Sequence, residues 1–580
     1  MQVAVLGVDV GGTFTDAVLI ADGDLRTAKV RTAKRQEESV LAAAAAVGAT
    51  EVERFTHGTT VATNALLERK GARTAFVATA GFEHLLHVRR QNRAHLYRLC
   101  EPHPEPLVPL ADCHGVRERI GPHGVIEPLA VETVPDLDAE AVAVCLLFSF
   151  RDPAHEEAVA AEIRRRLPAA HVVASHEVSP EFREYERAST TAADAYLGPR
   201  LAGYLRALGT RCRQAGLPEP LVMRSSGGVA SLEEAAAHAS WALLSGPAGG
   251  VVGAARLAEC AGFADAIAFD MGGTSTDVCL ISNGAAERSP ERTIAGLPIR
   301  LPSVDVHTVG AGGGSIAWVD AGGALRVGPQ SAGAVPGPAC YGLGGTRPTV
   351  TDANLLLGRL PGTLADGIEL DTAAAERALG ALEPLDLVQL VNAEMLRALR
   401  VVTVERGRDP HDFALVAFGG AGPLHACELA EELGVSTVLV PETAGVLSAV
   451  GLAVGDERRD HVRSEVRPLD EVNDLPAEGE ADLRYVGQSF ELSVPLGAGL
   501  AGRFHRLHEE RYGYADPARP LELVAVRTAE VHPGPQLVLP QGAPATATGP
   551  ATIELDGATC WLPRGWVGVR DGGSWRLTRA

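Results

Sequence analysis

The chain alternates short apolar runs with stretches rich in Ala, Leu and Glu over its first 150 residues. Short apolar runs bounded by turn residues predict buried strands, and the stretches between them predict the helices of an α/β unit. The predicted strands of this unit are VAVLGVDV (3–10), DAVLIA (16–21), AFVAT (75–79) and VAVCLLFSF (142–150).

The pattern changes several times further along the chain. Residues 84–123 are rich in Pro, Arg and His and have little periodicity, which predicts an insertion or an extended loop, whereas residues 151–215 predict helices. A second α/β unit begins after residues 223–231, and from about Asp456 alternating apolar and polar positions predict a mainly β region. We therefore expect an N-terminal lobe over 1–182, a second lobe over 183–455 and a smaller β-rich C-terminal region over 456–580.

One pattern of polar and apolar residues occurs twice. Residues 9–20 read DVGGTFTDAVLI and residues 270–281 read DMGGTSTDVCLI, so eight of twelve positions are identical. Each copy lies between two apolar runs, which predicts a β-hairpin closed by a tight glycine turn. A single Gly-Gly-Thr could be only a turn, but two copies with aspartates in register indicate a shared function.

Paired glycines allow a backbone to approach a ligand closely and to present its N–H groups, as phosphate-binding loops do. Carboxylates at strand ends can hold Mg²⁺ directly or through water. Two such hairpins facing each other predict a site for a nucleotide polyphosphate. The expected ligand-binding residues are Gly11, Gly12, Thr13, Thr15, Gly272, Gly273, Thr274 and Thr276, with Asp9 and Asp270 as metal ligands. Asp9, Asp270, Thr13 and Thr274 are the candidate catalytic residues.

Other glycine-rich turns are less specific. Ala417–Ala426 predicts a strand, a turn containing Gly419, Gly420 and Gly422, and a helix whose N-terminus favours an anion, although an ordinary helix-capping turn has the same pattern. Ser245–Gly250 is a weaker motif of the same type. Gly310–Ser315 is either a third phosphate-facing loop or a turn made of glycine alone, and Asp305 upstream is either part of the cleft or a surface residue.

Histidines offer two further candidates. His57, in HGTT (57–60), could bind an oxyanion or exchange a proton, or could be a satisfied histidine at a capping turn. His84 and His87 could share a helix face and a metal ion, but the remaining histidines and cysteines of the 84–123 stretch fit no standard ligand spacing.

Composition excludes several classes of function. A net charge of −21 disfavours nucleic acid and anionic membranes as partners. The nine scattered cysteines form no C-x-x-C pair, the N-terminus has no basic leader, and no apolar run is long enough to cross a membrane, so we expect a cytoplasmic protein. None of the three lysines completes a Walker motif. Neither a Ser/His/Asp triad nor a nucleophile elbow is present.

These motifs carry a family resemblance. The paired Asp-x-Gly-Gly-Thr hairpins resemble the two phosphate loops of the actin-like ATPase superfamily, whose lobes are duplicated RNase H-type α/β units. The wider sequence resembles the hydantoinase A/oxoprolinase family of that superfamily. The stretches that carry this resemblance are 57–72, 178–191, 243–255, 309–320, 337–360 and 416–426.

The resemblance implies a fold and a function. We expect two actin-like lobes with ATP and Mg²⁺ between them, Gly419, Gly420 and Gly422 in the adenosine motif, and a β-rich C-terminal region. The implied function is that of an ATP-dependent A subunit that phosphorylates the carbonyl oxygen of a cyclic amide or imide, after which a separate B subunit completes ring opening in a larger oligomer. Three alternatives remain open: a subunit of an acetone or acetophenone carboxylase-like complex, a stand-alone small-molecule kinase, and an ATP-gated activator without catalysis.

Overall fold

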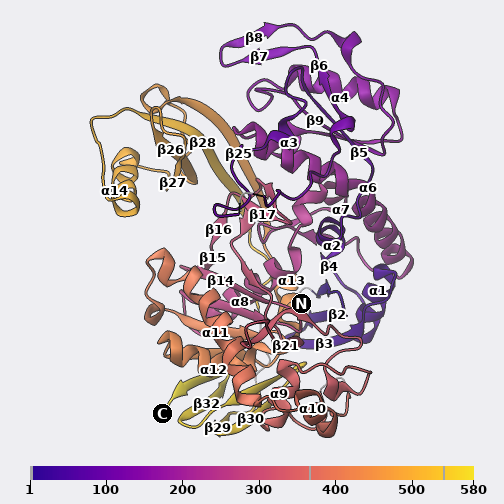
Figure 1. Cartoon of the computed structure of the whole chain (residues 1–580), viewed down its shortest axis with the longest axis vertical. Coiled ribbons are helices and arrows are strands. Elements are labelled where there is room, and N and C mark those ends of the chain that lie inside the picture. The colour runs from indigo at the N-terminus through magenta and orange to yellow at the C-terminus, as the bar shows by residue number, and fades with distance from the viewer. Residues whose placement is uncertain (1–3, 99, 365–366, 538, 540–541) are drawn as a thin grey trace.

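Two large sheets, one in each half of the molecule, form the frame of the fold (Figure 1). The computed structural model of the chain describes residues 4–98, 100–364, 367–537, 539 and 542–580. The strands of the first sheet, from edge to edge, are β27 (Leu492–Pro495), β26 (Glu480–Tyr485), β28 (Leu521–His532), β25 (Glu457–Pro468), β12 (Val229–Ala230), β11 (Leu221–Met223), β4 (Arg54–Thr59), β1 (Val5–Val10), β2 (Phe14–Ala21) and β3 (Asp24–Arg31).

The second sheet has the same central arrangement. Its strands, in spatial order, are β15 (Ala285–Ala286), β14 (Thr276–Ser282), β13 (Ala266–Met271), β23 (Ala414–Phe418), β24 (Thr437–Pro441), β33 (Ser574–Arg579), β32 (Trp566–Asp571) and β29 (Ala545–Thr548), and β20 (His307–Val309) also pairs with β14.

The two halves share one topology. In the first sheet β1 pairs antiparallel with β2 and parallel with β4, and β11 continues parallel to β4. In the second sheet β13 pairs antiparallel with β14 and parallel with β23, and β24 continues parallel to β23. Three antiparallel strands followed by two parallel ones form an RNase H-type unit, so the predicted duplicated actin-like α/β fold is confirmed.

Two helices pack between the sheets, α8 (Ser245–Cys260) and α13 (Leu447–Val454). Glycines allow this close packing: a Cβ on Gly451 would lie 1.9 Å from the carbonyl oxygen of Gly249, and one on Gly7 of β1 would lie 2.1 Å from that of Ala449. The Gly-rich start of α8, Ser245–Gly250, therefore allows close helix packing. The same segment also lies beside the cleft. The outer faces of the sheets are covered by α1 (Gln36–Ala46), α6 (Glu184–Gln214), α11 (Pro384–Val402) and α12 (Gly422–Leu433).

A smaller sheet extends the first half. Its strands are β10 (His171–Ala174), β9 (Ala141–Cys145), β5 (Thr74–Thr79) and β6 (Cys113–Val116), and it packs against α6 and α4 (Ala154–Arg166). The stretch expected to be an insertion or loop contains α3 (Leu85–Val88), then, over the described residues 89–98 and 100–109, neither helix nor strand, and then a 3-10 turn at Leu110–Asp112 and β6. Three partly buried residues before the buried Val116 give β6 too little periodicity to be recognised in the sequence.

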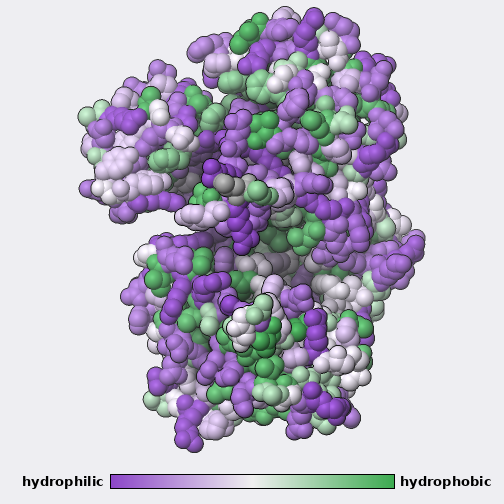
Figure 2. Space-filling model, in the orientation of Figure 1, coloured by the Kyte–Doolittle hydropathy of each residue, from purple (hydrophilic) through white to green (hydrophobic). Residues whose placement is uncertain are grey.

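The C-terminal 125 residues are rich in β-structure, as expected, and their strands join both sheets. Strands β25 to β28 lengthen the first sheet and form, with α14 (Leu500–Tyr512), an arm that projects from the body (Figure 1). Figure 2 shows that the surface is hollowed between this arm and the half below it. Strands β29, β32 and β33 lengthen the second sheet, and the hairpin β30 (Ala551–Leu555) and β31 (Ala558–Leu562) lies beside it. Among the described residues, no helix has the length and apolar character needed to cross a membrane.

Candidate functional site

The two copies of the repeated motif form turns of the same geometry. In the first, the Gly11 amide donates to the carbonyl of Phe14 at 2.9 Å, and in the second the Gly272 amide donates to that of Ser275 at 3.0 Å. The burial of the two turns also matches, since Thr13 and Thr274 are exposed at equivalent positions. A Cβ added at Gly12 or at Gly273 would meet no atom within 4 Å. Both turns therefore present open backbone, as a ligand-binding loop requires.

The protein itself holds the carbonyl side of each turn. In the first, Thr32 donates from its hydroxyl to the Gly11 carbonyl at 3.0 Å and from its amide to the Thr13 carbonyl at 2.9 Å. In the second, the amides of Gly313 and Gly314 donate to the carbonyls of Gly272 and Gly273 at 3.0 and 2.8 Å.

The Gly310–Ser315 segment thus supports the second turn from behind. Ala311 to Ser315 are buried, and a Cβ on Gly312 would lie 2.6 Å from the Gly273 backbone. This role answers the question that the sequence left open: the glycines are there for close packing on the turn. Asp305 forms a 2.6 Å ion pair with Arg406 at the surface.

Thr15 and Thr276 differ from the other predicted ligand-binding residues because both are buried. The Thr15 hydroxyl shares a 3.0 Å hydrogen bond with that of Thr32, and the Thr276 hydroxyl donates to the Ala311 carbonyl at 2.6 Å. Their hydroxyls fix the turns, and the exposed hydroxyls are those of Thr13 and Thr274.

Asp9, on β1, has a buried carboxylate oxygen without a partner. Within the described residues, its Oδ1 makes no hydrogen bond. A Cβ on Gly58 would lie 2.6 Å from this oxygen, and one on Gly246, in the first turn of α8, 3.5 Å from it. The pKa of Asp9 is raised to about 7, chiefly by burial and to a smaller extent by Asp16, while Lys29 opposes the rise. An orphaned carboxylate oxygen of this kind suits a cation.

Asp270 occupies the equivalent position on β13. A Cβ on Gly419 would lie 2.3 Å from its Oδ1, just as Gly58 flanks Asp9. Burial raises the pKa of Asp270 to about 8, with smaller contributions from Asp277, then Asp9 and Asp16. Asp9 lies close enough to Asp270 to raise its pKa, so the two predicted metal ligands interact electrostatically.

The predicted adenosine motif adjoins Asp270. Gly419 has φ +79°, and its amide donates to the carbonyl of Ala444 at 2.9 Å. The Ala421 amide donates to the carbonyl of Met271 at 2.9 Å, so the turn is fastened to the end of β13. Gly422 begins α12, and a Cβ on Gly420 would meet only the Gly557 carbonyl, at 3.8 Å.

A lysine that the sequence analysis did not select connects the two halves at the cleft. Lys29, on β3, lies 2.7 Å from Asp16 and donates to the carbonyl of Gly445 at 3.2 Å. The neighbouring Thr27 hydroxyl donates to Asp556, in the turn between β30 and β31. The only feature of the sequence that could have drawn attention to Lys29 was the rarity of lysine.

His57 lies inside β4 and is fully buried. Its Nδ1 bonds the Val8 carbonyl at 3.2 Å, and its Nε2 bonds the hydroxyl of Tyr204 at 2.8 Å. Burial lowers its pKa to about 4, which keeps the ring neutral. Of the two interpretations of HGTT, the satisfied histidine agrees with this geometry.

Metal binding by histidine and cysteine finds no support in the described part of the chain. Nowhere in it do three or more His, Cys, Asp or Glu side chains gather in a way that could hold an ion. His87 instead bonds the carbonyl of Val108 at 3.1 Å. A Mg²⁺ ion needs fewer protein ligands, since it is commonly held by one or two carboxylates, by waters and by the phosphates of a substrate. Asp9 and Asp270 fit that requirement.

Comparisons with known proteins agree with this architecture. A model of the hydantoinase/oxoprolinase N-terminal region matches residues 5–167, and the hydantoinase/oxoprolinase model matches residues 187–461. The caprolactamase subunit alpha of Pseudomonas jessenii is 35% identical, over 94% of this chain and 90% of that protein. The acetophenone carboxylase gamma subunit of Aromatoleum aromaticum is 35% identical, over 78% of this chain and 68% of that protein.

A solved structure gives the same answer. The crystal structure of the ATP-dependent caprolactamase from Pseudomonas jessenii superposes with a TM-score of 0.86 at 31% identity, covering 99% of this chain and 100% of that one. The fold and the paired turns define an actin-like ATPase architecture. Within that class, this chain belongs to the hydantoinase/oxoprolinase family.

Proposed function

We propose that this chain is the ATP-using subunit of an enzyme that opens a cyclic amide. It would phosphorylate the carbonyl oxygen of the ring, and a separate B-type subunit would complete hydrolysis. The observation that carries the proposal is the pair of equivalent turns with Asp9 and Asp270 beside them, in a chain similar along most of its length to an ATP-dependent caprolactamase.

Each part of the site has a role in this proposal. The backbone of Gly11, Gly12, Gly272 and Gly273 would bind the phosphates, and the exposed hydroxyls of Thr13 and Thr274 would stabilise charge on the transferred group. Asp9 and Asp270 would hold Mg²⁺, which supplies a positive charge between phosphate oxygens. The turn from Gly419 to Gly422 would adjoin the nucleoside.

The chemistry follows from the weakness of an amide as an electrophile. The carbonyl oxygen attacks the γ-phosphorus of ATP, an oxygen–phosphorus bond forms, and the bond from that phosphorus to the departing ADP breaks. The ring nitrogen loses its proton to solvent, which leaves an O-phosphorylated imidate whose negative charge lies on the phosphoryl group. Water then adds to the activated carbon, and the ring nitrogen takes up a proton and departs, which opens the ring and leaves an acyl phosphate. A second water, in the step completed with the partner, hydrolyses this acyl phosphate and releases inorganic phosphate.

Without its partner, this chain should open lactam rings far more slowly than an enzyme normally turns over, well below about 1 s⁻¹. The reason is that its site offers carboxylates and backbone amides for phosphoryl transfer, and the buried His57 is already bonded at both nitrogens. Incubation of the purified chain with caprolactam or 5-oxoproline and Mg·ATP, followed by detection of the free amine, measures this. Ring opening at an ordinary enzymatic rate would refute the two-subunit proposal.

The buried carboxyls also predict a pH dependence of stability. The pKa values of Asp9 and Asp270 are raised to about 7 and about 8, so the folded protein keeps protons that the unfolded chain has lost. Stability contributed by these protons is complete at acidic pH and is lost as pH rises from about 4 towards 8, by at most about 1.4 kcal/mol per pH unit for each group.

We therefore expect the unfolding midpoint of the metal-free protein to fall between pH 6 and pH 8, and Asp270→Asn to reduce that fall. Mg·ATP should raise the midpoint more at pH 8, where the carboxylates are charged and free to bind the metal. Thermal unfolding at the two pH values, with and without Mg·ATP, gives the comparison. An identical pH dependence in Asp270→Asn would show that this carboxyl does not control it.

The similarity to the acetophenone carboxylase gamma subunit supports one alternative, in which the activated carbonyl is carboxylated. Mg·ATP would be used in the same cleft, and the partner would determine the outcome. Assays with the product of the neighbouring gene, with bicarbonate present or absent, distinguish ring opening from carboxylation.

A further inference from the structure

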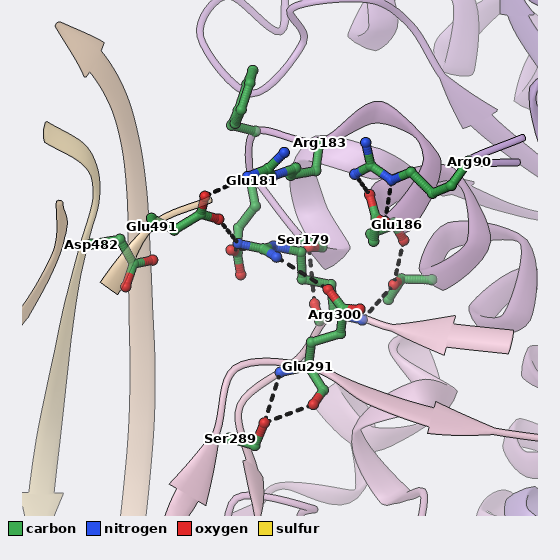
Figure 3. Close-up of polar contacts among 12 residues, drawn as sticks. Arg90, Ser179, Glu181, Arg183, Glu186, Ser289, Glu291, Arg300, Asp482 and Glu491 are labelled. Carbon is green, nitrogen blue, oxygen red and sulfur yellow. Dashed lines mark hydrogen bonds and ion pairs between the residues drawn. The ribbon is translucent and has the colours of Figure 1, made fainter. Parts of the chain in front are cut away.

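A cavity of about 270 Å³ lies where four distant segments meet, away from the repeated turns. They are the start of α6, the hairpin of β17 (Arg292–Ile294) and β18 (Leu297–Ile299) with the residues that flank it, the loop before β27, and the chain after α3, which contributes Arg90. Figure 3 shows arginine and glutamate side chains converging there from these segments. The sequence analysis selected none of these side chains, and the proposed function does not use them.

Arg300, which lines the cavity, belongs to a buried ion network. Arg300 lies 2.7 Å from Glu181. Arg527 lies 2.6 Å from the same Glu181 and 2.9 Å from Asp482. All four side chains are nearly inaccessible to solvent. Burying charges is costly even when they are paired, so a network of this kind is weak evidence for stability alone.

The rim carries further pairs that face the cavity. Arg90 donates to Glu186 at 2.8 Å, Arg183 pairs with Glu491, and Arg300 reaches Glu291 at 3.1 Å. The Arg90 side chain is 46% exposed and that of Glu291 is 35% exposed, so both remain accessible to a small molecule. Phe490, 40% exposed, supplies an apolar surface on the same wall.

The charged side chains that line the cavity balance one another. Three carboxylates (Glu186, Glu291 and Glu491) and three guanidinium groups (Arg90, Arg183 and Arg300) line the cavity, so its lining carries both signs and no net charge. The nearby Arg484 and Glu522 pair with each other and do not alter the count.

Glu291 is the least fully paired carboxylate of the lining. Its one ion-pair partner in the described structure is Arg300, which also serves Glu181 and Glu491. Burial raises the pKa of Glu291, Arg300 opposes the rise, and the neighbouring Glu186 adds to it. In a network that served only to join segments, every charge would be fully paired. This network surrounds an open cavity and includes an under-paired carboxylate, Glu291.

We propose that this cavity binds a zwitterionic amino acid with a terminal ammonium group. The ammonium group lies against Glu291 and Glu186, the carboxylate lies against Arg90 and Arg183, and the methylene chain packs on Phe490. The cavity, at about 270 Å³, has room for a small molecule of this kind.

The charge pattern alone sets the ligand class. The biological meaning rests on the proposed function: ring opening of a lactam yields an amino acid of this type, so the cavity would sense or retain the product. A lining without net charge favours a product of no net charge, such as 6-aminohexanoate, over glutamate, which carries a second carboxylate.

Calorimetry without nucleotide tests the binding site directly. The purified full chain should bind 6-aminohexanoate in a saturable manner and should bind hexanoate, which lacks the ammonium group, at least tenfold more weakly. Glu291→Gln should weaken 6-aminohexanoate binding at least tenfold and leave the affinity for Mg·ATP unchanged. Glu157→Gln, which changes an exposed carboxylate on α4, is the matched control and should bind normally.

A second variant keeps the test decisive if Glu291→Gln does not fold. Arg90→Gln should weaken 6-aminohexanoate at least tenfold and should not weaken hexylamine, because it removes the carboxylate contact and leaves Glu186 without its guanidinium partner. No saturable binding of 6-aminohexanoate below about 10 mM, or equal affinity in wild type and both folded variants, would overturn the proposal. Failure of the wild-type chain to bind Mg·ATP, or of the complete enzyme to open a lactam ring, would instead count against the proposed function. A failure of the cavity proposal and a failure of the proposed function are therefore distinguishable.

Discussion

Replacement of Asp270 by alanine is expected to reduce turnover at least tenfold in the complete enzyme. Its carboxylate lies at the end of β13 beside Gly419, within the electrostatic field of Asp9. If it holds the metal that neutralises the transferred phosphoryl group, its loss costs more than about 1.4 kcal/mol of transition-state stabilisation. The fold should persist, because the removed charge is one whose burial is itself unfavourable.

The measurement is the steady-state rate of ADP release with the partner subunit and substrate present, beside the unfolding midpoint of the variant. Asp136→Ala is a matched control, since the Asp136 side chain is almost fully exposed and contributes only to a surface ion pair. A turnover within twofold of wild type in folded Asp270→Ala would remove this residue from the catalytic machinery.

The fold and the core of the site could be predicted because their signals are local. Each repeated motif is a hairpin within one continuous segment, so the residues that form the turn are also the residues that the sequence presents together. The repetition itself indicated duplicated lobes. Both copies have the same register across the hairpin, with Asp9 opposite Asp16 and Asp270 opposite Asp277. This register follows from the two-residue period of a strand.

What the sequence could not predict comes from strand neighbours that are distant along the chain. Gly58 and Gly419 flank the two aspartates because β4 and β23 run parallel to β1 and β13, and parallel pairing leaves no signal at short range. Lys29 reaches Gly445 across more than four hundred residues. The mixed-charge cavity likewise needs four segments that only the folded chain brings together.

The C-terminal region illustrates the same limit. Alternating positions after Asp456 correctly predicted β-structure. They carried no information on which sheet each strand would join, because an edge strand of either sheet has the same half-buried pattern. In the structure, β25 pairs with β12 of the first sheet and β33 with β24 of the second, so one stretch of chain extends both halves.

Gly12→Val and Gly273→Val are each expected to abolish ATP binding while leaving a folded protein. The sequence suggested two kinds of damage, a clash with the nucleotide and an inaccessible backbone conformation. Neither glycine has a positive φ, so the second kind does not apply. A Cβ at either position meets no protein atom within 4 Å, so the added side chain extends into the open space where the phosphates would lie.

The two variants should behave alike, because a nucleotide held from both lobes needs both turns, and the turns share one hydrogen-bond pattern and one pattern of exposure. Gly203→Val on α6, where an added Cβ also meets nothing within 4 Å, controls for the effect of the substitution itself and should bind ATP normally. Calorimetric affinity for Mg·ATP beside circular dichroism decides the matter. Normal affinity in either folded variant would mean that its hairpin is only a structural turn, and the two-loop model of nucleotide binding would then have to be abandoned.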